Sequence, residues 1–249
     1  MTAGGRHPEL IAHRGASNER PENTLPAFLR ALDCGADGIE LDVHATRDGA
    51  VVVHHDPRPH VEAPGPALAG KPIAALRLSE LQGFRVARDA GIPTLAESLR
   101  TIGTRAVVYV ELKGRDIERA VIDVVRSART TCAIHSFDHD AVRRVHELAP
   151  ELRTGLLFER YPYDPGSAMR ATGAMDIWPQ WELIDARLVE RVHAAGGRVI
   201  AWTVDAPEAA AFLIRLGADG ICTNELGLVG PVVHGVAAPG GAATDEGAA

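Results

Sequence analysis

Carboxylates with the spacing of metal ligands occur in two short apolar runs of the chain. Glu40 and Asp42 flank Leu41, so in a β-strand both carboxylates would project from the same face. Glu111 lies in a later run of the same kind. Because three carboxylates in one crevice repel one another unless a cation lies among them, we predict that Glu40, Asp42 and Glu111 bind a divalent metal ion. The alternative for any one of them is an ion pair with an arginine or a helix cap.

The expected ion follows from the ligand atoms. An all-oxygen ligand set with no cysteine nearby favours Mg²⁺ or Ca²⁺ over zinc. The three cysteines, Cys34, Cys132 and Cys222, are widely spaced and form no Cys-x-x-Cys motif. Buried reduced thiols are therefore expected, rather than a disulfide framework or a zinc site.

Two histidines, two cations and one tryptophan complete the candidate site. His13 and His55 follow apolar runs, and two imidazoles beside a metal-bound anion could act as general acid and base near neutral pH. Arg14 could bind phosphate oxygens through its planar guanidinium, and Lys113 could add a point charge. Trp202 is expected in the core, but it could also pack against an alcohol or glycerol group.

These residues need elements that bring distant segments together. Short β-branched runs are predicted as strands at 10–12, 38–43, 51–54, 106–112, 132–136, 155–158, 175–178, 199–204 and 220–223. Amphipathic runs are predicted as helices at 24–34, 94–102, 117–128, 138–148, 184–194 and 207–216. Repeated β-α alternation over 249 residues predicts an α/β fold, a single (β/α)8 TIM barrel with its site at the carboxyl ends of the strands.

One strand too many is present for an eight-stranded barrel. The run at 51–54 follows the previous strand too closely for a parallel crossover, and Asp48-Gly49 between them is a two-residue hairpin signal. We therefore predict a β-hairpin extension after strand two. A two-residue loop would place Asp42 opposite His55 and would turn His54 to the other face.

Two segments lack regular periodicity. Residues 56–72 are proline-rich and are predicted to form a short insertion over the barrel mouth. Residues 231–249 are rich in Ala, Gly and Pro, which predicts a disordered tail after a barrel domain at 8–229. A five-residue repeat, Gly-Ala-Asp-Gly-Ile, begins at Gly35 and again at Gly217, and is predicted to be a common helix-to-strand loop.

Charge and hydropathy limit the classes of partner that the chain is expected to bind. The net charge is −7, and no Lys/Arg run exceeds two residues, which argues against nucleic-acid binding. No signal peptide or membrane-spanning stretch is recognisable, so a cytoplasmic protein with no stable membrane insertion is expected. A small anionic substrate stays compatible with an acidic chain, because a metal ion can make one pocket positive. The sequence leaves the oligomeric state open.

The motifs together resemble the glycerophosphodiester phosphodiesterase family. The match is carried by Ile11–Ser17, Pro21–Thr24, Gly38–Val43 and Val53–Pro57, with weaker matches at Ile92–Glu97, Glu111–Lys113, Ser136–Asp138, Ala201–Val204 and Gly217–Ile221. The resemblance implies metal-dependent hydrolysis of a glycerophosphodiester to glycerol 3-phosphate and an alcohol. It implies His13 and His55 as the acid/base pair, carboxylates on the metal, and Arg14 and Lys113 on phosphate.

Some departures and rival interpretations bear on this resemblance. The proline-rich segment at 58–66 replaces an Asp-Arg-Thr-Thr stretch that many family members have, so the leaving group stays open. A lysophospholipase D-like enzyme on the same barrel would need an exposed apolar rim, and residues 57–72 contain few aromatics. A non-catalytic phosphate-binding barrel should lack one of the motif residues. An aldolase or isomerase would need a buried mid-strand lysine, for which Lys113 is the one candidate.

Overall fold

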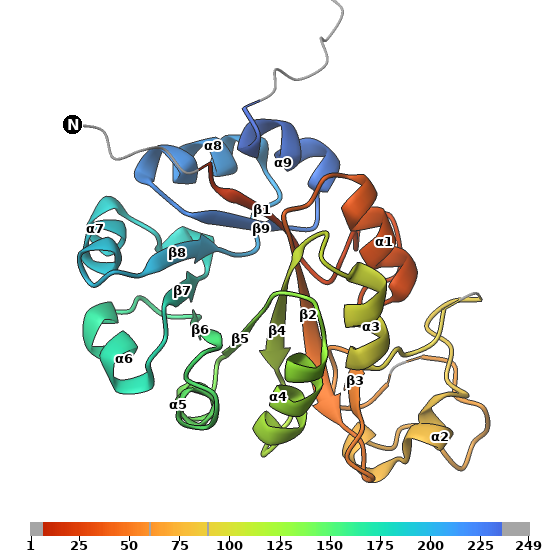
Figure 1. Ribbon diagram of the computed structural model, residues 1–249. Helices are drawn as coiled ribbons and strands as arrows, with labels where there is room; N and C mark the ends of the chain where they lie inside the picture. The colour runs from red at the N-terminus through yellow and green to blue at the C-terminus, as the bar shows by residue number, and fades with distance from the viewer. Residues whose placement is uncertain (1–6, 60, 89, 236–249) are drawn as a thin grey trace, which may run out of the picture.

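The structure is a computed structural model that describes residues 7–59, 61–88 and 90–235 (Figure 1). Its nine strands form one sheet in the order β1-β9-β8-β7-β6-β5-β4-β2-β3, and an added pairing of β1 with β2 closes it into a barrel. The strands are β1 (Glu9–Ala12), β2 (Gly38–Ala45), β3 (Val51–Val53), β4 (Val107–Leu112), β5 (Cys132–Ser136), β6 (Arg153–Phe158), β7 (Asp176–Pro179), β8 (Arg198–Ala201) and β9 (Gly220–Thr223).

Eight of these strands run parallel, and β3 alone pairs antiparallel, with β2. The predicted (β/α)8 barrel with a hairpin extension is therefore confirmed. Helices surround the barrel (Figure 1). They are α1 (Leu25–Asp33), α2 (Leu78–Leu81), α3 (Leu95–Ile102), α4 (Glu118–Ser127), α5 (His139–Leu148), α6 (Pro165–Thr172), α7 (Ala186–Ala194), α8 (Pro207–Leu216) and α9 (Leu226–Val233), with 3-10 turns at Ile73–Ala75 and Trp181–Leu183.

Local sequence explains where several helices begin. Thr24 and Thr94 accept hydrogen bonds from the third residue of the helix that each precedes, and Asp138 and Asp185 do so for α5 and α7. The sequence analysis missed α2, α6 and α9, which are short or contain Gly and Pro near their starts. The apolar faces of α1 and α3–α9 pack on the outside of the barrel, where they form the main core.

A second, smaller cluster fills the barrel interior. It consists of Ile11, Tyr109, Ala133, Leu157, Trp178, Ile200 and Cys222. Gly155 makes room for this packing, because a Cβ atom there would lie 2.9 Å from the Trp178 indole nitrogen. The interior is thus a packed plug, and polar side chains above it must lie at the strand ends.

The hairpin register differs from the predicted one. Val43 pairs with Val53 and Ala45 with Val51, and the Thr46 amide donates to the Ala50 carbonyl, so the loop holds three residues instead of two. The Thr46 hydroxyl donates to Asp48 and accepts from the Ala50 amide, and Gly49 takes φ +82°, which suits a three-residue loop that ends in a left-handed residue. The prediction that Asp42 lies opposite His55 is therefore wrong by one residue.

The proline-rich insertion also lies elsewhere than predicted. The described residues of the segment 56–93 include α2 and pack beside β3 (Figure 1). Together with Val52 of β3 they form a satellite core, whose buried members are Val52, Ile73, Leu76, Leu81, Phe84 and Ile92. None of the described residues between Asp56 and Pro93 lines the pocket at the strand ends. The insertion therefore supports the hairpin instead of covering the mouth.

The first residues of the predicted tail belong to a helix. The predicted tail starts at residue 231, but α9 continues to Val233 and buries Leu226, Val229 and Val233. Its contacts with β1 explain this order, since Gly230 lies close to the Leu10 side chain. The rest of the predicted tail, 236–249, lies outside the described residues. No helix in the described residues is long and apolar enough to span a membrane.

Candidate active site

A pocket opens at the carboxyl ends of the barrel strands, and most of its lining comes from residues on or just after a strand. It is lined by His13, Arg14, Glu40, His55, Glu111, Lys113, His135, Phe137, Leu157, Glu159, Trp178, Trp202 and Cys222. Seven of the eight predicted site residues are among them. The eighth, Asp42, is fully buried and lies against Arg14 and Lys113. The structure thus brings all the predicted residues together.

Glu40 and Glu111 are buried carboxylates whose negative charges are only partly offset by neighbouring cations and hydrogen bonds. Burial, and then the charge of Asp42, raises the pKa of each to about 7. One oxygen of Glu40 accepts a hydrogen bond of 3.0 Å from the Arg14 amide, while Oε1 has no hydrogen-bond partner within the described residues. Glu111 Oε1 lies 3.0 Å from Lys113 Nζ. Both side chains would be stabilised by a further positive charge.

Asp42 is the carboxylate with the most partners. Its Oδ2 accepts a hydrogen bond of 2.8 Å from the Asn23 amide and lies 3.2 Å from Arg14 Nε. Lys113 Nζ is 3.8 Å from Oδ1. Burial alone would raise the pKa of Asp42, but the charges of Arg14 and Lys113 outweigh burial and lower it. Asp42 is therefore ionised, and its Oδ1 has no hydrogen bond among the described residues.

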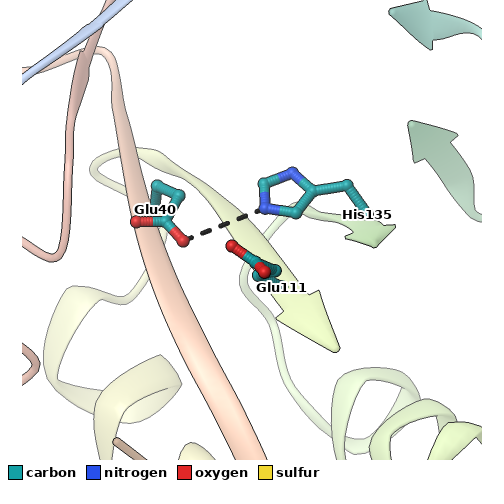
Figure 2. A group of neighbouring side chains, drawn as sticks. All are labelled: Glu40, Glu111 and His135. Atoms are coloured by element: carbon teal, nitrogen blue, oxygen red, sulfur yellow. Dashed lines mark ion pairs between the residues drawn. The ribbon is translucent and has the colours of Figure 1, made fainter. Parts of the chain in front are cut away.

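The sequence analysis missed His135, which is a fully interior residue of β5. Its partner in the parallel register is Glu111, and its Nε2 lies 3.9 Å from Glu40 Oε1 (Figure 2). Burial lowers the pKa of His135 to about 4, so its imidazole is neutral. The signal that could have found it is parity: His135 lies two residues after Ala133, which faces the barrel interior.

This donor set fits a divalent cation. Glu40, Glu111 and His135 each offer one ligand atom, and these atoms lie within 4.8 Å of one another. Unpaired buried oxygens are costly, at about 1–3 kcal/mol each, and a cation between them would satisfy several at once. Asp42 is outside this group and does not line the pocket, and its Oδ1 lies 3.8 Å from Lys113 Nζ. Two of the three predicted carboxylates, Glu40 and Glu111, are thus placed to share a metal ion, together with His135, which was not predicted.

His55 reaches the pocket although the hairpin register differs from the predicted one. The strand ends at Val53, and the following turn carries the His55 ring to Lys113, with 3.2 Å between Nε2 and Nζ. Its Nδ1 lies 2.8 Å from Asp56 Oδ1, so Nδ1 donates and Nε2 accepts from the ammonium group. The Nε2 lone pair therefore faces the pocket. His54 is not among the lining residues.

His13 is oriented by a residue that the sequence analysis did not select. Its Nδ1 lies 2.8 Å from Asn224 Oδ1, and the Asn224 amide nitrogen donates to Asp205, which fixes Oδ1 toward the imidazole. Nδ1 therefore donates, and Nε2 lies 4.0 Å from Glu40 Oε2. Asn224 follows β9, so a search of every strand end would have found it.

The two predicted phosphate-binding cations, Arg14 and Lys113, contact different sets of residues. Arg14 takes a left-handed conformation, φ 57°, and its guanidinium contacts both Glu22, at 3.1 Å, and Asp42. The nearby carboxylates raise its pKa against the effect of burial. Lys113 lies between Glu111, Asp42 and His55, with the Phe137 ring at 5.9 Å from Nζ. Both side chains line the pocket, and both contact Asp42.

Aromatic residues form one wall of the pocket. Trp202 donates from Nε1 to the Trp178 carbonyl at 2.9 Å and packs edge-to-face on Phe137, with ring centroids 5.5 Å apart. Phe137 is 39% exposed. Tyr161 and Tyr163, in the loop after β6, pack on each other, and Tyr163 is 80% exposed. Trp202 therefore lines the pocket together with Phe137 and Trp178.

Comparisons with known proteins agree on one family. The model of the glycerophosphoryl diester phosphodiesterase family matches residues 13–228. A glycerophosphodiester phosphodiesterase from Caldanaerobacter subterraneus is 34% identical over 235 residues, which cover 87% of this chain and 93% of the relative. The crystal structure of a glycerophosphodiester phosphodiesterase from Agrobacterium tumefaciens is similar, with a TM-score of 0.78, 26% identity, and coverage of 89% of this chain and 98% of that chain.

A further structural relative shares the fold. The Oleispira antarctica phosphodiesterase, solved in complex with its product sn-glycerol-3-phosphate, has a TM-score of 0.84 and 24% identity. The similarity covers 91% of this chain and 97% of that chain. The similarity thus extends over the whole barrel.

Proposed function

Since the chain belongs to the glycerophosphoryl diester phosphodiesterase family, whose named relatives are phosphoric diester hydrolases, we propose that it hydrolyses glycerophosphodiesters to glycerol 3-phosphate and an alcohol. The observation that carries this proposal is the pairing of two oriented imidazoles with an acidic cluster in one pocket. His13 and His55 each donate from Nδ1 to an oxygen and line the pocket, and the contact of 3.2 Å between His55 Nε2 and Lys113 Nζ is one that the substrate would replace.

The proposed roles follow from these orientations. One imidazole takes the proton from the attacking hydroxyl, and the other gives a proton to the departing alcohol oxygen. Lys113 and Arg14 contact the phosphate oxygens, and Trp202 packs against the alcohol or glycerol group. The attacking group is either water or the 2-hydroxyl of glycerol, in which case a cyclic phosphate forms first and water then opens it.

Glu40, Asp42 and Glu111 are proposed to hold one divalent cation. When bound, the cation would neutralise phosphate charge in the transition state. Glu40 Oε1, a buried oxygen with no hydrogen bond within the described residues, supports this role, and the carboxylates alone favour Mg²⁺ or Ca²⁺. Burial, and then the charge of Asp42, raises the pKa of Glu40 and Glu111 to about 7, and a bound positive charge would oppose that rise.

Alanine substitutions test the catalytic proposal. We expect His13→Ala and His55→Ala each to lower turnover of glycerophosphocholine by at least about 10²-fold, the usual contribution of a general acid or base. His139→Ala is the matched control, because His139 binds the Leu157 carbonyl at a strand end but does not line the pocket. Circular dichroism would verify the fold of each variant. Turnover near that of the unmodified protein in either variant would reject the assignment.

One observation favours a second candidate, lysophospholipase D-like activity. The exposed rings of Phe137 and Tyr163 provide apolar surface beyond the strand ends, from segments other than the proline-rich one. A lysolipid chain could lie on such a surface. A substrate panel of glycerophosphocholine and lysophosphatidylcholine, each assayed with EDTA, Mg²⁺ and Ca²⁺, separates the two candidates by the ratio of their kcat/KM values.

A further inference from the structure

His135 is a buried polar side chain that no structural contact explains. It is 1% exposed, and neither ring nitrogen has a hydrogen-bond partner within the described residues. Buried histidines that serve only packing normally bond to a carbonyl or carboxylate, and even the partly buried His139 bonds to the Leu157 carbonyl. The unpaired nitrogens of His135 therefore indicate a partner that is not a protein group.

The barrel register directs His135 at the acidic cluster. Glu111 and His135 are partners on the neighbouring strands β4 and β5, and Glu40 projects from β2 toward both (Figure 2). The 3.9 Å between His135 Nε2 and Glu40 Oε1 is too long for a hydrogen bond. It is close to the separation of two ligands on one ion, roughly 3 to 3.5 Å when each metal–ligand bond is about 2.1 Å.

The ring is also held in place. It packs edge-to-face on Trp178, with centroids 4.5 Å apart, and lies parallel to Tyr109 at 6.3 Å. These neighbours restrict the plane of the His135 ring, but neither forms a hydrogen bond with its nitrogens. The packing thus fixes an imidazole beside two carboxylates without satisfying its nitrogens, which is the arrangement of a preorganised metal ligand.

We propose that His135 is a nitrogen ligand of the cation that Glu40 and Glu111 bind, so that the site prefers Mn²⁺, Co²⁺ or Zn²⁺ to Mg²⁺ or Ca²⁺. This inference depends on the cation that the proposed function assigns to the site, and it adds which class of metal ion the site prefers. An imidazole adds little affinity for hard ions, which prefer oxygen, but contributes strongly for borderline transition ions. The mixed set therefore shifts the preference away from the ions that carboxylates alone favour.

Metal titrations of the EDTA-treated protein test the preference. Calorimetry would compare Co²⁺ and Mg²⁺ binding to the unmodified protein, to His135→Gln, and to His139→Gln as the matched control. We expect His135→Gln to weaken Co²⁺ binding by at least about tenfold, as loss of a metal-site residue commonly does. Mg²⁺ binding should change by less than about threefold, since Mg²⁺ gains little from nitrogen. An unchanged ratio of Co²⁺ to Mg²⁺ affinity would overturn the proposal.

A spectroscopic readout keeps the test valid if His135→Gln does not fold. Pulsed electron paramagnetic resonance of bound Mn²⁺ detects directly coordinated nitrogen. The double variant His13→Gln/His55→Gln keeps His135 and should retain the nitrogen coupling, because the two catalytic imidazoles are not the proposed ligands. Loss of the coupling in that double variant, or its absence from the unmodified protein, would overturn the proposal.

Hydrolysis assays run in parallel separate the two proposals. If the unmodified protein hydrolyses glycerophosphocholine with a bound ion but shows no nitrogen coupling, only the role of His135 is rejected. If nitrogen coupling is present but no diester is hydrolysed with any of the five ions, the proposed function is rejected and the ligand assignment stands.

Discussion

The Asn23 side chain holds the buried Asp42 in place beside the pocket. It lies in the turn before α1 with φ 57°, and its amide group makes two hydrogen bonds to Asp42, one to the carboxylate and one from the backbone amide. Thr24, the next residue, is the N-cap of α1. Asn23 thus fixes the aspartate that Arg14 and Lys113 also contact.

We predict that Asn23→Ala destabilises the protein by about 1–3 kcal/mol, because it leaves buried polar groups of Asp42 unpaired. Urea denaturation would measure the change. Asn18→Ala is the matched control, since Asn18 makes its hydrogen bond to Glu225 at the surface, and it should change stability by less than about 0.5 kcal/mol. Equal effects of the two substitutions would show that the Asn23 bonds contribute nothing beyond a surface contact.

The candidate residues could be selected from the sequence because their chemistry is unusual for their surroundings. Charged residues inside apolar runs, such as Glu40 and Glu111, are costly unless they have a role. His135 shares that property, but its run also ends in a serine, and a strand of five residues does not reveal which face lies inside. Only the register with Glu111 places its ring beside the carboxylates.

At the scale of elements, the hairpin shows where a local rule is insufficient. Asp48-Gly49 correctly predicted a tight turn, but Thr46 adds two side-chain hydrogen bonds that favour a three-residue loop. Gly49 then takes φ +82° and has open space around it. A side chain there would meet no clash, so any cost of substitution comes from the backbone conformation alone.

We therefore predict that Gly49→Ala destabilises the protein by about 1–2 kcal/mol, the cost of a left-handed conformation for a residue with a Cβ atom. Gly65→Ala provides the comparison, because Gly65 also has open space but an ordinary φ. It should be neutral or slightly stabilising. Chemical denaturation of both variants tests this, and a neutral Gly49→Ala would mean that the loop readily adopts another turn type.

The repeated Gly-Ala-Asp-Gly-Ile loop is an element that the sequence predicted well. Gly35 and Gly217 both have positive φ, as expected after a helix. The aspartates add a function that the sequence did not reveal: Asp37 accepts from the Leu10 amide and Asp219 from the Val199 amide. Each therefore ties a loop to the start of the neighbouring strand, which depends on strand order and cannot be derived from the repeat alone.

At the scale of the whole molecule, the two ends of the barrel carry different charge arrangements. At the amino-terminal end, Glu9, Arg153, Asp176 and Arg198 are the first residues of their strands. Asp176 is 1% exposed and lies 3.3 Å from both Arg153 Nε and Arg198 Nε, while Arg198 also binds Glu9 at 2.9 Å. The charges at this end neutralise one another in a set of ion pairs, as expected for a structural role, whereas the pocket end gathers three buried carboxylates around two cations, Arg14 and Lys113.

Asp176→Ala should therefore destabilise the protein by about 3–5 kcal/mol, because two arginines would lose a buried counter-charge. The exposed Asp140, paired with Arg143 on α5, is the control, and Asp140→Ala should cost less than about 0.5 kcal/mol. Urea denaturation measures both. A small effect of Asp176→Ala would show that water compensates the arginines.

A bound cation should stabilise the whole barrel, because it joins β2, β4 and β5 and removes repulsion between their carboxylates. At about 100 times its dissociation constant, an ion stabilises the folded state by about 2.7 kcal/mol, which raises Tm by roughly 5–10 °C for a chain of this size. Differential scanning calorimetry with EDTA and with added ion tests this. The variant Glu40→Gln/Glu111→Gln should show no shift, and an identical Tm of the unmodified protein in both conditions would argue against a cation.

The closure of the sheet has a consequence for synthesis on the ribosome. β1 pairs with β9 as well as with β2. One edge of the first strand to be synthesised therefore stays unpaired until the last strand has been synthesised. By the time β5 has left the exit tunnel, every proposed metal ligand has been translated, yet the sheet is still open. A nascent chain that stops before β9 would expose unpaired edges on β1 and β8, which are sites for association with other chains.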